Sequence, residues 1–263
     1  NGLPVGGLIR LNADASLDTS FMNDLLRSGA EPTSTLLLSD GKLLLAGSFT
    51  FNDGSVFTNK VIRLTASGEL DPTFSYQAAG TIYDVSIDAS GRIVMAGSLS
   101  YQDGGNTITR PFIRLNENGS VDLSLNAQPP TGADNVTSQG NKILYVIHET
   151  LPQQQFKMFR LNEDGSNDAT FIPTPLDNIG VVDVQIQPDN KIVVLEDLKV
   201  IRLNANGGID IPFQVQANYS AQARALYLHS DGKITVVHGN SSPNGARVIR
   251  MLGNGGMDLS FTP

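Results

Sequence analysis

The sequence predicts an all-β fold, a β-propeller built from four-stranded antiparallel blades. Three observations predict it. One phrase of thirteen residues occurs six times, a second phrase built around a tight turn alternates with it, and no stretch shows a sustained helical period. Antiparallel units that repeat every 42 to 53 residues are typical of propeller blades, whereas a solenoid of short parallel strands would repeat at a shorter period.

The first phrase stands near both ends of the chain. It is IRLNADASLDTSF over residues 9–21 and IRMLGNGGMDLSF over residues 249–261, and further copies begin at Ile62, Ile113, Phe159 and Ile201. Its first half is a short β-prone run, and its second half is a further short run entered by a turn. Every copy has an arginine at its second position, at spacings of 53, 51, 46, 42 and 48 residues: Arg10, Arg63, Arg114, Arg160, Arg202 and Arg250.

The second phrase predicts a β-hairpin. LLLSDGKLLLAG, from Leu36, consists of two apolar runs around Asp-Gly, which is the strongest short-range hairpin signal. Related copies begin at Val85, Val136, Val184 and Leu226. A basic residue follows the turn in each copy: Lys42, Arg92, Lys142, Lys191 and Lys233.

One unit therefore contains four strands, A to D, of which the hairpin phrase supplies A and B and the arginine phrase supplies C and D. The chain starts at a C strand, so five full units follow an initial C–D pair. We expect a single β-propeller domain over residues 1–263, with six blades of which one is incomplete. A five-bladed ring is the alternative. A domain or an anchor segment upstream of residue 1 would supply the missing A–B pair.

Composition and charge exclude several classes of function. The net charge is −8, so the chain has no general attraction for nucleic acid. The sequence has no cysteine, which excludes disulfides, thiolate metal sites and cysteine nucleophiles. No apolar stretch approaches the length of a transmembrane segment, and residues 1–7, NGLPVGG, lack the features of a signal peptide.

The two phrases, in the general forms IRLNxDGSxDxxF and xQPDGKIxxxGxF, resemble the delta-60 repeat of bacterial secreted and surface proteins. The resemblance covers nearly the whole chain, with departures at Ala15, where the pattern has a turn glycine, and at Leu125, where it has a phenylalanine. It implies a propeller in the cell envelope. It further implies similarity to surface lipoproteins of Bacteroidota, which accompany outer-membrane nutrient importers of the SusC/SusD-like type.

We interpret the six arginines as structural. An aspartate follows eight residues after each of them, as Asp71 follows Arg63. Because blade faces are buried against their neighbours, an arginine held there needs an acceptor. The repetition itself serves the shared architecture of the units.

The candidate binding face is the one that carries the long and variable B–C and D–A connections, because binding residues concentrate on variable loops of a rigid scaffold. It offers Phe51, Phe57, Tyr101, Phe156, Tyr76 and Tyr219 for stacking. Asp84 and Asp183 precede A strands and are expected at the mouth of the central channel, together with Thr35, Asn135 and Ala225. There the two carboxylates would bind a cation or a sugar hydroxyl.

We therefore expect a non-catalytic binding or scaffold propeller, a surface-exposed and outer-membrane-associated component of a nutrient-uptake assembly; a secreted or periplasmic location is the alternative. Its partner would be a protein, with a glycan or a peptide as ligand. No metal or cofactor is expected, since His148, His229 and His238 lack metal-ligand spacing and the turn around Asp164 lacks the order of a calcium loop. A purely structural disc in a larger assembly is equally compatible with these residues. The enzymatic alternative is a glycan-active hydrolase or lyase that uses Asp84 and Asp183 as its carboxylates.

Overall fold

The structure is a computed structural model. It describes residues 8–12, 14, 16–21, 31–50, 56–127, 133–149, 155–172, 175–176, 180–213, 223–239 and 247–261. Two units make up the chain, residues 1–132 and residues 133–263. The described residues form strands and turns, and no helix among them is long and apolar enough to cross a bilayer.

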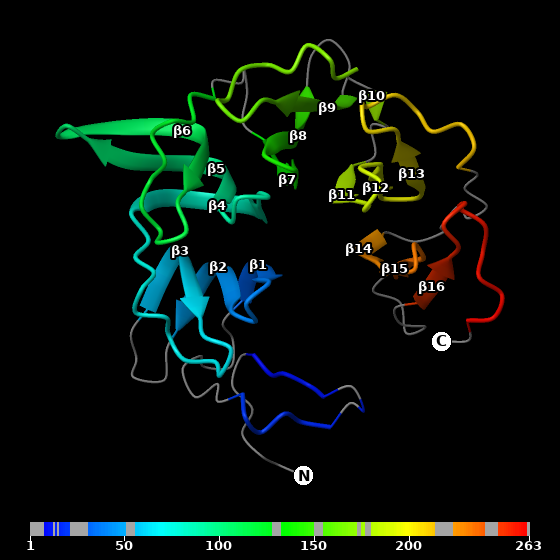
Figure 1. The fold of residues 1–263 in the computed structure, drawn as a ribbon, viewed down its shortest axis with the longest axis horizontal. Coiled ribbons are helices and arrows are strands. Elements are labelled where there is room, and N and C mark those ends of the chain that lie inside the picture. The colour runs from blue at the N-terminus through cyan, green and yellow to red at the C-terminus, as the bar shows by residue number, and fades with distance from the viewer. Residues whose placement is uncertain are drawn as a thin grey trace. The chain divides into compact units, whose positions relative to one another are not determined.

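The first unit contains two three-stranded antiparallel sheets. In each, the strands stand side by side in chain order and neighbours run antiparallel (Figure 1). The first sheet comprises β1 (Glu31–Leu37), β2 (Leu43–Thr50) and β3 (Val56–Leu64). The second comprises β4 (Ala78–Ile87), β5 (Ile93–Asp103) and β6 (Asn106–Leu115).

The second unit contains three further antiparallel sheets, one of four strands and two of three. One comprises β7 (Asn135–Gln139), β8 (Lys142–Glu149), β9 (Gln155–Leu161) and the two-residue β10 (Pro175–Leu176). The next comprises β11 (Val181–Ile186), β12 (Ile192–Glu196) and β13 (Val200–Leu203). The last comprises β14 (Ala223–Leu228), β15 (Ile234–His238) and β16 (Arg247–Met251).

Apolar side chains on the middle strands build the core between neighbouring sheets. All five residues of β12 are buried, because a middle strand has a neighbouring sheet on both of its faces. In the first unit, Leu44 and Val61 of one sheet share a cluster with Ile82 and Met95 of the next. The sheets therefore pack face to face, as blades do.

The predicted A–B hairpins are present in all five sheets. Four of them close with the same bond, in which the residue after the first strand donates to the carbonyl of the basic residue, as Leu38 N does to Lys42 O at 2.8 Å. Asn190 has a φ of 64° and stands where the other turns place glycine, such as Gly91 with a φ of 78°. Asparagine is one of the few residues that tolerate this left-handed conformation.

The predicted D strand is shorter than expected. Among the described residues it makes a single antiparallel bridge to the C strand in each copy, such as Leu64 with Leu70. The chain bends next because the following aspartate accepts hydrogen bonds from its own turn: Thr73 N donates to Asp71 Oδ1 at 2.9 Å and Phe74 N to Asp71 O at 3.2 Å. Only one described sheet has a fourth strand, β10, and it lies beyond the segment NDATF of residues 167–171.

One connection predicted as a long loop is a regular hairpin. β5 and β6 stay paired out to Asp103 and Asn106 and extend beyond the rest of their sheet (Figure 1). Gly104 and Gly105 close the turn with φ values of 55° and 85°, the combination that a two-residue type I′ turn requires. At the other extreme, β12 and β13 are joined by a tight turn in which Glu196 N donates to Lys199 O at 2.9 Å.

Candidate functional site

Each repeated arginine forms an ion pair with the aspartate eight residues later. The Nε–Oδ2 distance lies between 2.6 and 2.8 Å in all six copies. Residue pairs at this spacing face each other because the C strand turns back directly into the D segment. Arg63, Arg114 and Arg160 are buried, Arg114 to 1% exposure, so these guanidinium groups serve the fold and are not presented to a ligand.

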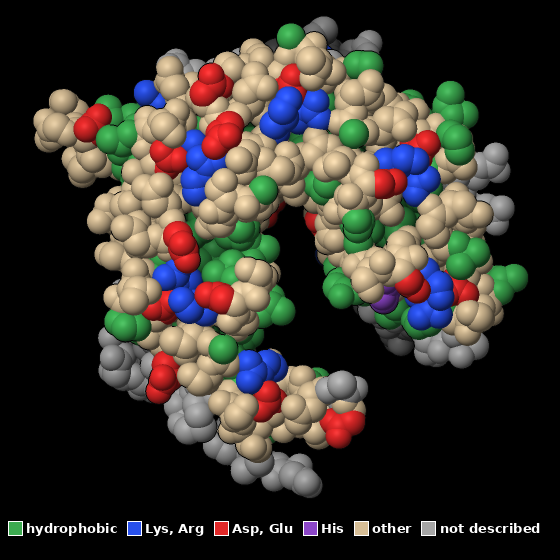
Figure 2. All heavy atoms as spheres, in the orientation of Figure 1, with side chains coloured by type: hydrophobic (Ala, Val, Ile, Leu, Met, Phe, Trp, Pro, Cys, Tyr) green, Lys and Arg blue, Asp and Glu red, His purple; other side chains and the backbone are tan. Residues whose placement is uncertain are grey.

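A second cation reaches each aspartate after the first copy, which the sequence did not predict. It is the basic residue of the A–B hairpin: Lys142 Nζ lies 2.6 Å from Asp168 Oδ2, and Lys42 Nζ lies 3.1 Å from Asp71 Oδ2. Arg92, Lys191 and Lys233 approach their aspartates at 3.7, 3.1 and 3.4 Å. Figure 2 shows lysine and arginine side chains beside acidic ones on the face in view.

Hydroxyl groups complete the aspartate sites. The Thr73 hydroxyl donates to Asp71 Oδ1 at 2.6 Å, and Ser or Thr takes the same place beside Asp18, Asp122, Asp168 and Asp258. That hydroxyl bond, with the bonds from Thr73 N, Lys42 and Arg63, holds the pKa of Asp71 well below its usual range although burial opposes the shift. Burial would likewise raise the pKa of Asp168, but Lys142, Thr170 and Arg160 outweigh it and hold the pKa low.

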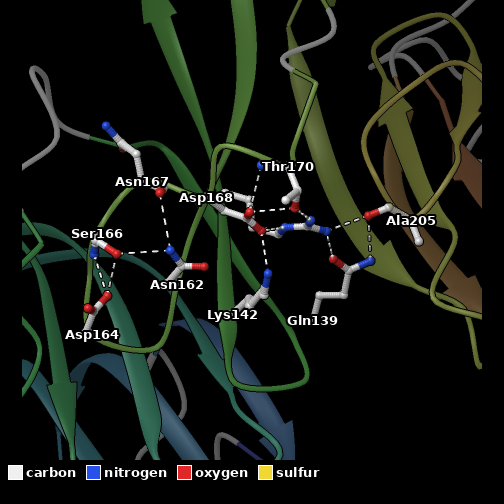
Figure 3. A network of polar contacts seen from close by, with 10 residues as sticks. Gln139, Lys142, Asn162, Asp164, Ser166, Asn167, Asp168, Thr170 and Ala205 are labelled. Carbon is white, nitrogen blue, oxygen red and sulfur yellow. Dashed lines mark hydrogen bonds and ion pairs between the residues drawn. The ribbon is translucent and has the colours of Figure 1, made fainter.

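The arginines also connect one sheet to the next. Arg63 Nη1 donates to Glu117 O at 2.6 Å, and Arg160 Nη1 donates to Ala205 O (Figure 3). Arg10 and Arg202 make the corresponding bonds to Ala66 O and Gly253 O. Each of these acceptors lies in the next copy of the arginine phrase. The repeated phrase therefore encodes a contact between blades as well as a contact within one.

The phenylalanine that ends the arginine phrase supplies a ring beneath the guanidinium. Five arginines lie 4.4 to 5.0 Å from the ring centroid of the residue eleven positions later, for example Arg160 over Phe171. This is the geometry of a cation–π contact. The third copy has Leu125 at that position, so Arg114 lacks the ring. The departure from the repeat pattern thus removes one defined contact.

Three of the aromatic candidates lie on strands, where the sequence placed them in loops. Tyr101 is on β5, opposite Ala78 and Ile108 and packed against the core cluster of its unit. Phe57 is on β3, with its backbone opposite Phe49. Phe156 on β9 stacks on His148, with ring centroids 4.5 Å apart. Phe51 and Tyr219 lie outside the described residues.

Tyr76 points inward and its hydroxyl is buried. Burial raises the pKa of Tyr76 to about 12. Lys60 lies 5.5 Å from its ring centroid. This tyrosine is therefore part of the packing of its sheet and not a stacking group for a ligand.

Asp84 and Asp183 lie inside β4 and β11, where the sequence placed them before the strands. Each follows a β-bulge, since the pairing register shifts between Ile82 and Asp84 and between Val181 and Asp183. Bulges redirect the side chain next to them. β1 has the same register shift, between Pro32 and Ser34. Ser34 is the first residue after that shift, as Asp84 is after its own, so Ser34 and not Thr35 is the counterpart of Asp84.

The two carboxylates have different surroundings. Asp84 Oδ1 accepts from the amide of Val85 at 2.8 Å. Asp183 Oδ2 accepts from Gln185 Nε2 at 3.0 Å, and burial raises the pKa of Asp183 although this bond and the amides of Val184 and Leu226 act against the shift. Asp84 belongs to the first unit and Asp183 to the second.

The three histidines take part in packing. His148 stacks on Phe156, His229 Nε2 lies 2.7 Å from Thr235 Oγ1, and His238 is buried at the end of β15. Within the described ranges, no three His, Asp or Glu side chains are grouped so that they could hold a metal ion. The turn around Asp164 is a polar hairpin, in which Ser166 N donates to Asp164 Oδ1 at 2.9 Å (Figure 3).

Comparison with known proteins agrees with this architecture. A family model described as "Domain of unknown function (DUF5122) beta-propeller" matches residues 1–21, 38–74 and 89–125, and no curated protein matches the sequence. A protein of unknown function from Bacteroides caccae has a TM-score of 0.51 at 13% identity, over 88% of this chain and 81% of its own. Streptogramin B lyase has a TM-score of 0.52 at 14% identity, over 90% of this chain and 74% of its own.

Identities this low establish a shared fold and nothing about activity. The matched segments contain the arginine phrase and the hairpin phrase in their alternating order. These three segments are thus similar to the β-propeller repeat that the DUF5122 model describes, in agreement with the resemblance to the delta-60 repeat.

Proposed function

We propose that this chain is a non-catalytic binding and scaffold propeller of the bacterial cell envelope. The observation that carries the proposal is the β5–β6 hairpin, an extension of one blade that the packing of the repeats does not require. Asp103 still pairs with Asn106 at its tip, whereas β12 and β13 end at a tight turn. An extended hairpin on one blade presents a surface to a partner that the other blades do not have.

The hairpin has the composition of an interaction surface. Tyr101 is half-buried on one strand and is surrounded by exposed polar residues such as Gln102, Asn106 and Thr107. An aromatic anchor within a polar rim is the arrangement that concentrates binding energy in protein interfaces. Gln102 Nε2 donates to Thr107 Oγ1 at 2.9 Å across the ribbon, which holds the rim in place before a partner arrives.

The use of the charged residues supports a role without catalysis. In every copy of the repeat the arginine and the aspartate neutralise each other within the scaffold. Asp84 and Asp183, two carboxylates outside that scheme, accept hydrogen bonds from backbone amides, of Val85 for Asp84 and of Val184 and Leu226 for Asp183. Such bonds give both residues a structural task.

The location and the assembly rest on the family resemblance. The chain would act at the cell surface as an outer-membrane-associated lipoprotein component of a nutrient-uptake assembly of the SusC/SusD-like type. Its partner there would be a protein, with a glycan or a peptide as ligand. The net charge of −8 suits an exposed soluble surface rather than contact with anionic lipid.

The enzymatic alternative is a glycan-active hydrolase or lyase that uses Asp84 and Asp183. The observation in its favour is the raised pKa of Asp183, because a carboxylic acid that holds its proton can act as a general acid. Activity on a glycan panel that disappears in Asp183→Asn, with folding retained, would establish this alternative and refute the binding proposal.

The test of the binding proposal compares two tyrosines. Tyr101→Ser removes the anchor of the hairpin, and Tyr227→Ser removes a tyrosine that is 61% exposed on β14. Purified variants are used to capture partners from envelope extract of the source organism, and bound proteins are quantified by mass spectrometry. We expect Tyr101→Ser to lower capture of one outer-membrane protein at least tenfold and Tyr227→Ser to leave it unchanged. Equal capture by both variants would show that the hairpin is not the partner surface.

A further inference from the structure

A buried glutamine fills the space between two neighbouring A–B turns of the second unit. Gln139 lies at the end of β7, is 8% exposed, and donates through Nε2 to Asn190 O at 2.7 Å and to Ala205 O at 3.4 Å. Its Oε1 accepts from Arg160 Nη1 (Figure 3). One carboxamide therefore joins the turns of two sheets.

The next pair of sheets repeats the contact between the glutamine and the arginine. Gln187 has the corresponding position after β11, is buried, and accepts through Oε1 from Arg202 Nη1 at 3.4 Å. In the second unit, a buried glutamine thus lies beside the repeated arginine at the A–B turn of both the β7 sheet and the β11 sheet.

In the first unit the corresponding residue is Leu38. The match is set by the hairpin bond, since Leu38 N donates to Lys42 O as Gln187 N donates to Lys191 O. Leu38 turns its side chain into the core cluster of its unit. Its side chain has no polar atom, so Leu38 cannot make the hydrogen bonds that the glutamine carboxamide makes.

The partners of the glutamine have counterparts in the first unit. Glu117 O accepts from Arg63 Nη1, as Ala205 O accepts from Arg160 Nη1. Gly91 precedes Arg92 in its turn with a φ of 78°, as Asn190 precedes Lys191 with a φ of 64°. The backbone carbonyls to which the glutamine amide donates in the second unit are therefore repeated here, without the glutamine.

A hollow of about 380 Å³ occupies this place, which we call the Leu38 slot. It is lined by Leu37, Leu38, Asp40, Ile87, Asp88 and Glu117, among others. A Cβ added to Gly91, which also lines it, would meet no atom within 4 Å, so this side of the slot is open. The volume lies within the range of small-ligand sites and accommodates one long side chain.

The charge of the slot is negative. Asp40 and Asp88 have local cations, Lys42 at 3.4 Å and Arg92 at 2.7 Å. The carboxylate of Glu117 is exposed and has no ion pair within the described part of the chain. Arg63 also lines the slot, but it is buried and its charge is balanced by Asp71 at 2.8 Å.

We propose that the Leu38 slot binds an arginine side chain of a partner protein. The planar guanidinium would donate to the carbonyls of Gly91 and Glu117, as the carboxamide of Gln139 does in the second unit, and it would pair with the Glu117 carboxylate. Its alkyl stem would lie against Leu37, which is 74% exposed, and against Ile87. A lysine ammonium carries the same charge but lacks the planar pair of donors, so arginine is preferred.

The slot is separate from the surface in the proposed function. Ile93 lines the slot at the start of β5. Tyr101 lies eight residues further along that strand, which corresponds to roughly 26 Å at about 3.3 Å per residue. Loss of binding at one surface therefore leaves the other intact, and the two proposals can fail independently.

The experiment uses the full chain with labelled leucine and isoleucine methyl groups and N-acetyl-arginine methylamide as the probe. We expect saturable shifts of the Leu38 and Ile87 methyl signals at millimolar probe, as befits a small fragment. The citrulline analogue, which is neutral and nearly isosteric, is expected to bind at least fivefold more weakly, and the norleucine analogue at least tenfold. Equal shifts with all three probes, or none with arginine, would overturn the proposal.

Variants separate the slot from the rest of the surface. Glu117→Gln is expected to weaken arginine binding about fivefold, whereas Glu163→Gln, at the matching position of the next repeat, is expected to leave it unchanged. Leu38→Gln restores the carboxamide found at Gln139 and is expected to abolish binding, with folding checked by circular dichroism. Wild-type binding by both Leu38→Gln and Glu117→Gln would refute the assignment.

Discussion

The triad of Arg160, Lys142 and Asp168 makes a quantitative prediction about the stability of the scaffold. Arg160 is 8% exposed in its side chain, Asp168 3% and Lys142 40%. Removal of one member of a buried ion pair costs about 3 to 5 kcal/mol when the other charge is left without compensation. Here Lys142, 2.6 Å from Asp168, still compensates the carboxylate after Arg160 is lost.

Arg160→Ala should therefore lower the free energy of unfolding by about 3 kcal/mol, at the lower end of that range. The loss includes the bond to Ala205 O and the contact with the Phe171 ring at 4.8 Å. Asp168→Ala leaves two cations without a counter-charge and should lower it by about 4 to 5 kcal/mol. Lys142→Ala removes a partly solvated charge and should lower it by no more than about 1 kcal/mol.

The assay is equilibrium unfolding in urea, followed by far-UV circular dichroism and by tyrosine fluorescence, because the chain has no tryptophan. Arg110→Ala is the control, since among the described residues Arg110 makes only a local bond to Thr109 O within the β5–β6 hairpin, and it should change the unfolding free energy by less than about 0.5 kcal/mol. A loss below about 1 kcal/mol for Arg160→Ala, or a larger loss for Lys142→Ala than for Arg160→Ala, would refute the reasoning.

Three further predictions concern the repeat. Leu125→Phe supplies the ring that Arg114 lacks and should raise the unfolding free energy by about 0.5 to 1 kcal/mol; no gain in urea unfolding would argue against the cation–π contact. Gly119→Ala puts a Cβ 2.5 Å from a main-chain oxygen, whereas a Cβ at Gly140 meets nothing within 4 Å, so the first variant should be less stable than Gly140→Ala by about 1 to 3 kcal/mol; equal melting temperatures would contradict this. The pKa of Asp71 is held low in the folded state, so the stability that the ionised Asp71 contributes is present above the unfolded pKa of about 3.9 and is lost as pH falls from there toward the folded pKa. Asp71→Asn should therefore be less stable than the wild type at pH 7 and should lose less stability in an acid titration. Parallel curves of unfolding free energy against pH for the two proteins would refute this linkage.

The sequence determined those features that depend on residues close together along the chain. A hairpin is fixed by its turn residues and by the alternation around them, so the A–B hairpins were predictable from segments such as LLLSDGKLLLAG. The ion pair between Arg63 and Asp71 was predictable for the same reason, because only eight residues separate the two side chains. Repetition of both phrases then gave the architecture, since each unit can bury its apolar faces only against the next.

The tertiary structure alone decided what joins residues far apart in sequence. Lys142 and Asp168 are 26 residues apart, and Arg63 and Glu117 are 54 apart, so neither contact has a local pattern. The β-bulges before Ser34, Asp84 and Asp183 come from the pairing of two strands, which composition does not encode. The D strand is shorter than expected because the Asp71 carboxylate accepts a hydrogen bond from Thr73 N, which bends the chain directly after the bridge.

The candidate surfaces show the same division. Aromatic residues in the B–C connections identified Tyr101 from sequence, but only strand pairing shows that it stands on a ribbon that continues to Asp103. The Leu38 slot had no sequence signal, because a leucine in a hairpin is unremarkable until its neighbour across the blade interface is known. A hollow remains where none of the segments that meet there provides a side chain to fill the space. Which segments meet depends on how the blades pack, and the linear sequence does not state this.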